Sequence, residues 1–206
     1  MFRCKTVRMF VFFLCGIFAA ATPLFAQNLD AQTQQLVDRH IRNGRAEAND
    51  ERAIAHFTNA LELAPRRGDI HILIGDRQKN LNQTDLALGS FRNGVRFGGD
   101  TTHAMFQQAE ILKELSLKDG LNVNLAVEAA RRYRDVYLRD PSHLQAVKNR
   151  GILLFFLAEN SRNDEVASRR LANEAIIMLE KYLETNRNDR DARNYSNRAR
   201  ALLGNT

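Results

Sequence analysis

The side chains that could do chemistry in this sequence are mainly carboxylates, histidines and two cysteines. Glu110 and Glu114 are four residues apart, a spacing that places both carboxylates on one face of a helix and could serve acid–base catalysis. Lys113 and Lys118 lie beside them, so a solvated, ion-paired helix face is the simpler interpretation. The sequence has no GxSxG motif, no phosphate-binding glycine-rich loop and no dinucleotide-binding fingerprint. We therefore expect a protein that is not an enzyme and uses no cofactor.

The histidines and cysteines do not form a metal-binding pattern. Both cysteines, Cys4 and Cys15, lie within residues 1–26, so a chain cleaved after that segment has no disulfide, no thiolate ligand and no thiol nucleophile. No two of the five histidines share a predicted helix at the spacing of metal ligands. We expect no metal site. The histidines are His40, His56, His71, His103 and His143.

Residues 1–26 have the pattern of a secretory signal peptide. Residues 1–8 carry basic side chains and no acid, an apolar run from Met9 to Phe25 follows, and the small residue Ala26 precedes a polar stretch. We predict cleavage after Ala26 and a periplasmic or secreted mature chain. The alternative is an uncleaved membrane anchor, although a run of about 17 residues that contains Pro23 is short for crossing a bilayer.

Composition and charge exclude several classes of protein. The chain is 44% hydrophobic, enough to bury a core, which excludes wholesale disorder. Its net charge is +6, but three of its basic residues belong to residues 1–26. The basic stretches at 131–134 and 187–200 are interrupted by Asp135, Asp189 and Asp191, so no continuous basic track is present. We expect no nucleic-acid partner, and a membrane contact only if the N-terminal helix is uncleaved.

A pattern of a small residue, an aromatic residue and a helix-ending residue recurs along the chain. The aromatic follows the small residue by 4 positions, the helix-ending residue follows by 8 more, and the first two copies are 34 residues apart. Because positions i and i+4 share one helix face, the small residue lets a neighbouring helix approach while the aromatic ring fills the adjoining space. The copies are Ala53, Phe57 and Pro65; Ala87, Phe91 and Gly99; and Ala129, Tyr133 and Pro141.

This pattern resembles that of the tetratricopeptide repeat (TPR) family, in which a glycine also stands in the first helix of each 34-residue unit. Gly75 fills that position in residues 68–101, and Gly151 fills it in the fourth unit. In the first unit Ile41 stands where the glycine is expected. The third and fourth units hold about 8 and about 12 extra residues, which we place around residues 118–124 and 161–172.

The resemblance implies an all-α fold: a right-handed α-solenoid of about four helix-turn-helix repeats followed by a C-terminal capping helix. The predicted helices cover 29–44, 49–63, 69–81, 85–97, 102–116, 123–138, 143–159, 165–185 and 189–203. The mature domain spans 27–206, with repeats at about 34–67, 68–101, 102–143 and 144–188 and the cap at 189–203. Residues 152–157 are apolar around the whole helix, so they are either buried by the last helices or exposed to a partner.

The resemblance also implies a function. TPR proteins bind peptides in a concave groove lined by the first helix of each pair, and Ile72 and Asp76 replace the Lys and Asn with which chaperone-binding members hold a C-terminal carboxylate. We therefore expect a non-catalytic periplasmic scaffold or assembly factor that binds a protein or peptide of the cell envelope. The alternatives are a membrane-anchored subunit and an accessory of a cell-wall enzyme. The predicted groove residues are Ile72, Asp76, Lys79, Phe106, Glu110, Lys113, Lys148, Ile152 and Phe155.

Overall fold

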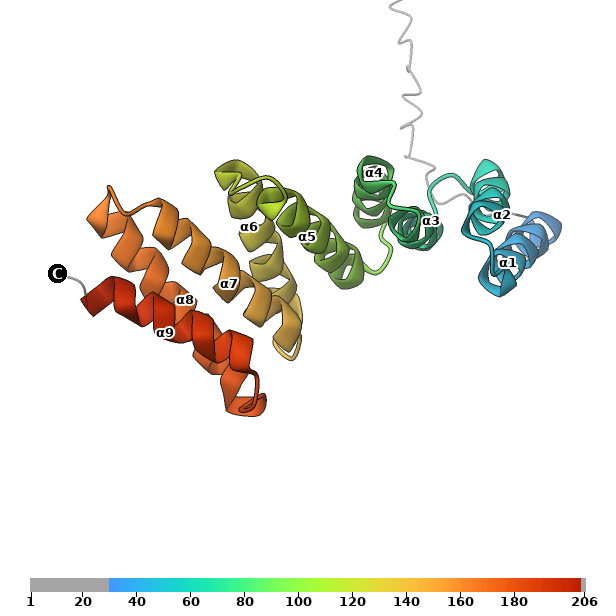
Figure 1. Cartoon of the computed structure of the whole chain (residues 1–206). Helices are drawn as coiled ribbons and strands as arrows, with labels where there is room; N and C mark the ends of the chain where they lie inside the picture. Colours follow the sequence, from blue (N-terminus) through green and yellow to red (C-terminus); the bar gives the residue numbers. More distant parts are fainter. Residues whose placement is uncertain (1–29, 205–206) are drawn as a thin grey trace, which may run out of the picture.

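The computed structural model describes residues 30–204, and every regular element across that range is an α-helix (Figure 1). The helices stack in chain order from α1 to α9, and each of those in this range begins and ends within about two residues of its predicted position. The all-α solenoid prediction is confirmed. The helices are α1 Ala31–Ala46, α2 Asp50–Leu63, α3 Gly68–Asn80, α4 Thr84–Arg96, α5 Thr101–Leu117, α6 Val123–Arg139, α7 Leu144–Asn160, α8 Glu165–Thr185 and α9 Arg190–Gly204.

Short polar side chains fix where most of these helices begin. In each case the side chain of the residue before the helix accepts a hydrogen bond from the backbone N–H three residues ahead, which satisfies one of the free donors of the first turn. At α1, for example, the Thr33 N–H lies 2.9 Å from Asp30 Oδ1. The same contact precedes α1, α2, α5, α6 and α8, made by Asp30, Asn49, Asp100, Asn122 and Asp164.

The small and aromatic residues of the repeat pattern pack the core between helices. Phe57, Phe91 and Tyr133 are all completely buried, as are the alanines that precede them by four residues. A Cβ atom added to Gly75 would lie 2.8 Å from the ring of Phe91, so α3 and α4 approach each other more closely than any larger residue permits. Gly75 and Phe91 therefore make the close contact between α3 and α4 that the small and aromatic residues of the pattern predict.

In the first unit, the glycine that allows the two helices to approach stands at a different position from the one that the sequence predicts. Ile41, which stands in the place of the expected glycine, is buried in the core of α1 to α3. Gly44, one turn later, lies against the aromatic ring instead, and a Cβ atom there would be 2.5 Å from Phe57. The close approach of α1 and α2 thus depends on a glycine three positions beyond the one that the repeat pattern specifies.

The extra residues of the third and fourth units lengthen helices instead of forming long loops. α5, α6 and α7 have 17 residues each and α8 has 21, whereas α3 and α4 have 13. The prediction that placed these residues around 118–124 and 161–172 is correct only in part, because just a few residues at each place form a turn. The added helical turns bury further apolar side chains, including Leu157.

The core is divided along the stack. One cluster joins α1, α2 and α3; a second extends from α3 to α7; two smaller clusters join α7, α8 and α9. Within the apolar stretch 152–157, four residues are buried and two, Ile152 and Phe156, are only partly buried. The last two helices cover Leu154 and Phe155, whereas Leu153 and Leu157 pack into the cluster that extends from α3 to α7, and one stripe of α7 stays open.

Candidate functional site

The predicted groove residues come from α3, α5 and α7, the first helices of their pairs. In Figure 1, α5, α7 and α9 lie in front of α6 and α8, and contacts between side chains join α5 to α7 and α7 to α9. We call this side of the molecule, formed by the predicted groove residues together with α9, the first-helix face. Its polar residues lie close enough to contact one another across neighbouring helices.

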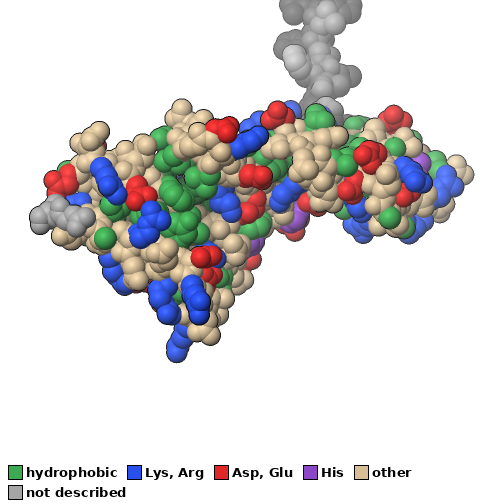
Figure 2. All heavy atoms as spheres, viewed as in Figure 1, with side chains coloured by type: hydrophobic (Ala, Val, Ile, Leu, Met, Phe, Trp, Pro, Cys, Tyr) green, Lys and Arg blue, Asp and Glu red, His purple; other side chains and the backbone are tan. Residues whose placement is uncertain are grey.

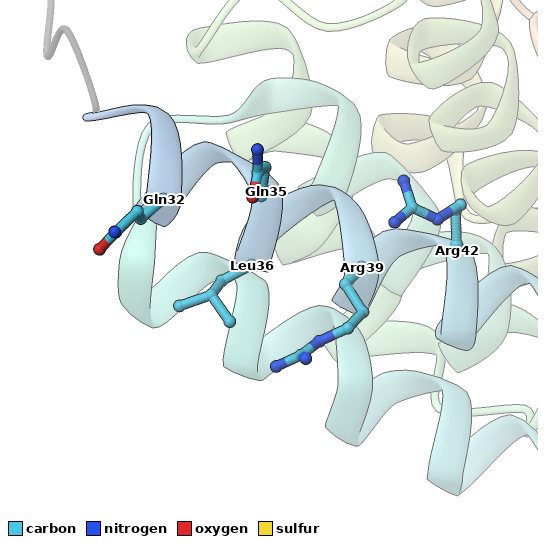
Figure 3. A pocket seen from close by; sticks show the side chains of 5 residues that line it. All are labelled: Gln32, Gln35, Leu36, Arg39 and Arg42. Carbon is cyan, nitrogen blue, oxygen red and sulfur yellow. The ribbon is translucent and has the colours of Figure 1, made fainter.

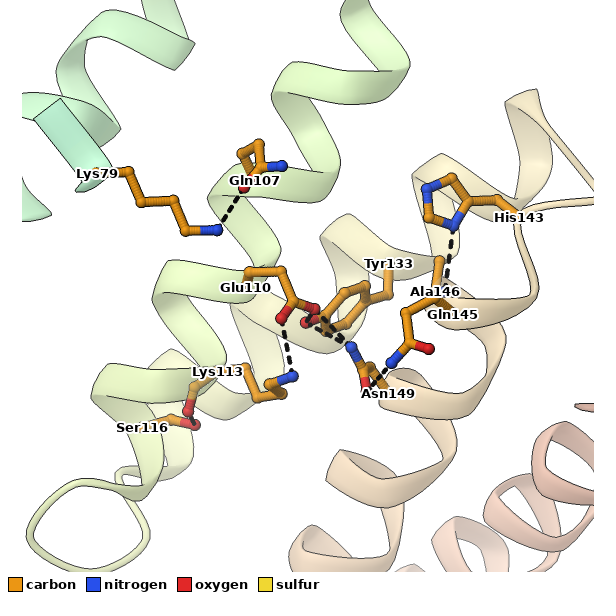
Figure 4. A network of polar contacts seen from close by, with 10 residues as sticks. All are labelled: Lys79, Gln107, Glu110, Lys113, Ser116, Tyr133, His143, Gln145, Ala146 and Asn149. Atoms are coloured by element: carbon orange, nitrogen blue, oxygen red, sulfur yellow. Dashed lines mark hydrogen bonds and ion pairs between the residues drawn. The ribbon is translucent and has the colours of Figure 1, made fainter. Parts of the chain in front are cut away.

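Glu110 is the centre of a polar network on this face (Figure 4). Its Oε1 accepts hydrogen bonds from the Tyr133 hydroxyl of α6 and from the Asn149 side-chain amide of α7. Its Oε2 lies 3.0 Å from Lys113 Nζ, and Gln145 Nε2 extends the network by donating to Asn149 Oδ1 at 3.2 Å. One carboxylate therefore holds three helices together.

This network argues against acid–base chemistry at Glu110. The carboxylate already accepts three donors, and Glu114, the other member of the pair considered from the sequence, is exposed to solvent. Burial raises the pKa of Tyr133, and the negative charge of Glu110 raises it further. Tyr133 consequently stays protonated and keeps donating to Glu110. We interpret Glu110 as a residue that fixes the orientation of α5, α6 and α7.

Two contacts join α3 to α5. His103 Nε2 lies 3.0 Å from Asp76 Oδ1, and Lys79 Nζ donates to Gln107 Oε1 at 2.5 Å. The hydrogen bond to Asp76 raises the pKa of His103, and partial burial opposes this effect. Both side chains of the ion pair remain more than a third exposed, so its contribution to stability is small. Asp76 and Lys79 are thus occupied by neighbours within the chain.

A third contact joins α7 to the start of α9. Lys148 Nζ lies 2.7 Å from Asp189 Oδ2, which also accepts from the Tyr182 hydroxyl at 2.9 Å. Asp189 Oδ1 accepts from the Ala192 N–H at 3.0 Å and so caps α9. Burial opposes ionisation of Asp189, but these hydrogen bonds outweigh it and lower its pKa to about 2.

Two of the predicted apolar groove residues lie in the core instead. Ile72 is 6% exposed and packs against the backbone glycines that end α4, and Phe155 is completely buried between α7, α8 and α9. The sequence analysis assigned both to the groove through the repeat positions alone. Neither is accessible to a partner in this structure: Gly94 and Gly99 allow α4 and its end to pack onto Ile72, and α8 and α9 cover Phe155.

The other two apolar groove residues remain partly exposed. The ring of Phe106 lies between His143, with centroids 4.4 Å apart, and Tyr133, with centroids 5.9 Å apart. Ile152 packs at the edge of the cluster formed by α7, α8 and α9. Phe106 and Ile152 therefore have one side fixed by the core and one side available for contact.

Several residues that complete this face were not among the predicted groove residues. His103, Gln107 and Asn149 supply the partners of the predicted polar residues, and Tyr195 of α9 lies 5.7 Å from Phe156, centroid to centroid. Helical spacing predicts on which face of its own helix each of these residues lies. It does not predict which residue of a neighbouring helix lies opposite, because that depends on the angle between the helices. Tyr195 could be placed only by recognising that α9 continues the series of first helices.

The rest of the described chain offers no stronger site. A shallow hollow of about 510 Å³ runs along α1, but its described lining is one face of a single helix, whose side chains point outward in different directions (Figure 3). It is lined by Gln32, Gln35, Leu36, Arg39 and Arg42. Within residues 30–204, no three acidic, histidine or cysteine side chains are grouped so that they could bind a metal ion. None of the helices described is both long enough and apolar enough to cross a membrane.

Comparisons with known proteins identify the fold. No protein-family model and no curated protein sequence matches the chain. Among solved structures, YrrB, described as a TPR protein with an unusual peptide-binding site, is 13% identical over 84% of this chain and 93% of its own, with a TM-score of 0.52. MamA is 11% identical over 83% of this chain and 92% of its own, with a TM-score of 0.51. A MamA RS-1 double mutant is 12% identical and gives a TM-score of 0.52, covering 85% and 96%.

These similarities confirm the TPR resemblance at the level of the fold. The chain is an all-α solenoid of TPR-like repeats, and it covers nearly the whole of each of these neighbours. The low identity means that the similarity concerns the arrangement of helices and not the residues of any binding site. The predicted signal peptide and its cleavage after Ala26 lie outside the described residues and remain predictions.

Proposed function

We propose that this protein is a non-catalytic interaction module that binds a protein or peptide on its first-helix face. The observation that carries the proposal is the series of contacts that joins α3, α5, α7 and α9 into one continuous face: Asp76 with His103, Glu110 with Asn149, and Lys148 with Asp189. Helices fixed in this way present a preorganised surface, which reduces the entropy lost when a partner binds.

The fold supports this class of function. Solenoids of stacked repeats present extended surfaces, and one of the structural neighbours is described as having a peptide-binding site. We further propose that the mature chain acts in the periplasm or outside the cell, as a scaffold or assembly factor of the cell envelope. The pattern of residues 1–26 supports this location. The alternatives are a membrane-anchored subunit and an accessory of a cell-wall enzyme. In both, the first-helix face would still bind the partner, but the protein would be attached to the membrane or to the enzyme.

The test begins with the full chain expressed with its own leader in a Gram-negative host. We expect protein in the periplasmic fraction that begins near Gln27, as determined by intact mass. An envelope extract passed over this protein should yield a specific partner, and Phe106→Ala or Ile152→Asp should reduce its capture about tenfold or more without changing the far-UV circular dichroism.

The control is Arg131→Glu, an exposed residue of α6 outside the first-helix face. Arg198 is unsuitable as a control because its guanidinium lies 4.5 Å from the centroid of the Phe155 ring and 5.7 Å from that of the Tyr195 ring. Capture that survives the changes at Phe106 and Ile152 but is abolished by Arg131→Glu would transfer the function to the opposite side of the stack.

A further inference from the structure

The first-helix face is divided into a polar part and an apolar part. The contacts of Glu110 lie in the middle of α5 and those of Lys148 at the start of α7. One or two turns further along these helices stand the apolar residues Leu117, Ile152 and Phe156. Figure 2 shows hydrophobic side chains gathered over α7 and the adjoining end of α5. We call these partly exposed residues the apolar ledge: Leu117, Ile152, Phe156, Tyr195 and Leu202.

The ledge is continuous between α7 and α9. The rings of Phe156 and Tyr195 are 5.7 Å apart, and Phe156, Tyr195 and Leu202 pack against the same buried cluster. Ile152 and Tyr195 share a second cluster. At the end of α5, Leu117 is 37% exposed. The side chains of the ledge on α7 and α9 are therefore held in place by the core while one side of each is open to solvent.

Several charged side chains of α7 and α9 beside the ledge are already paired within the chain. Glu159 accepts from both Arg162 and Arg198, at 3.3 and 3.2 Å. Arg150 pairs with Glu174, and Lys148 pairs with Asp189 at 2.7 Å. A charged partner would have to displace one of these pairs and would lose its own hydration, so it would gain little. An uncharged partner would lose no such hydration and would bury apolar surface.

We propose that the apolar ledge docks an uncharged, apolar segment of the partner protein. This inference rests on the proposed function and specifies the chemistry of the partner segment: leucine-like and aromatic side chains without flanking acidic or basic residues. Since no ion pair forms across such an interface, the affinity depends only weakly on ionic strength.

The test measures fluorescence anisotropy of three labelled synthetic peptides with the purified full chain. Each peptide places the same Leu and Phe residues at helical spacing, on a Ser and Gln background in the first, with added Asp in the second and with added Lys in the third. We expect the uncharged peptide to bind most tightly, with a Kd that changes less than about twofold between about 50 and about 500 mM NaCl.

Two variants of the ledge and one control locate the binding. Ile152→Asp should raise the Kd of the uncharged peptide about tenfold or more, and Leu117→Asp should do the same without a folding defect, because that side chain is already partly in solvent. The matched control Leu138→Asp changes a 67% exposed leucine of α6 and should leave the Kd unchanged. Thermal melting of each variant verifies that it is folded.

Several outcomes would overturn the proposal: no binding of the uncharged peptide, preference for a charged peptide with a Kd that rises about tenfold with salt, or equal effects of Leu117→Asp and Leu138→Asp. Sedimentation showing a dimer that Ile152→Asp dissociates would also overturn it, because a second copy of the chain would then cover the ledge. If the envelope partner is still lost on Ile152→Asp while no uncharged peptide binds, the interaction function stands and this inference alone fails.

Discussion

Single glycines decide how closely the helices of this solenoid approach. Replacing a helical glycine by alanine usually stabilises a helix by about 1 kcal/mol, because alanine loses less backbone entropy. At Gly75 the new methyl group would overlap the completely buried ring of Phe91. We expect Gly75→Ala to lower the free energy of unfolding by about 1–3 kcal/mol despite its better helix propensity, as measured by urea denaturation.

Gly89 is the matched control for this prediction. It lies in α4, is exposed, and a Cβ atom there would have no neighbour within 4 Å. Gly89→Ala should therefore raise the free energy of unfolding by about 0.5–1 kcal/mol. Equal and positive effects of the two substitutions would mean that α3 and α4 can separate without cost, which contradicts the packing described above.

At this scale the sequence predicted the core better than the surface contacts. Ala87, Phe91 and Gly75 could be placed because each is specified by its spacing along one or two adjacent helices. The partners of Glu110 could not, because Tyr133 and Asn149 belong to other helices and their approach depends on interhelical angles. Phe155 was assigned to the groove by its repeat position, but α8 and α9 pack against it and bury it, which the repeat position does not show.

The helix α9 is fixed at its N-terminus by Asp189, which caps the helix and pairs with Lys148 of α7. The pKa of Asp189 is lowered to about 2 in the folded chain, against an ordinary value of 3.8. A lowered pKa contributes stability that is present above the ordinary value and is lost as the pH falls through the folded value. We expect Asp189→Asn, which keeps a side-chain oxygen for the cap, to lower the free energy of unfolding by about 2 kcal/mol at pH 7.

This difference between Asp189→Asn and the unchanged chain should shrink as the pH is lowered from about 4 to about 2, as measured by denaturant titration at each pH. Asp119→Asn, in the exposed turn between α5 and α6, is the control and should have little effect at any pH. A loss that is independent of pH would contradict a stabilising role for the negative charge of Asp189 beside Lys148.

The existence, the order and the bounds of the helices could be predicted from the sequence to within about two residues, although the standard 34-residue repeat does not supply the lengths of α5 to α8. Their extra residues include good helix formers such as Leu115 and Leu171. The repeat pattern does not include these residues, because it specifies only the positions of a standard 34-residue unit. The helices extend because their added turns bury one another's leucines, which pack against the cluster that joins α3 to α7.

At the scale of the whole molecule, the separate core of α1 to α3 gives the N-terminal end its own stability. Stacked repeats contact only their neighbours, so an end unit can open without the rest. The cluster that extends from α3 to α7 is larger than the cluster of α1 to α3. We expect native-state hydrogen exchange to be fastest in the amides of α1 and α2 and slowest in those of α5, α6 and α7. Uniform protection along the stack would contradict a divided core.

The unequal helix lengths also make the two ends of the stack different. A helix of 13 residues is about 20 Å long and one of 21 residues is about 32 Å long, at 1.5 Å per residue. The pair α7 and α8 is therefore longer than the pair α3 and α4. On the first-helix face a bound polypeptide would cross 13 residues of helix at α3 but 17 at α5 and α7, so its two orientations meet these helices in a different order.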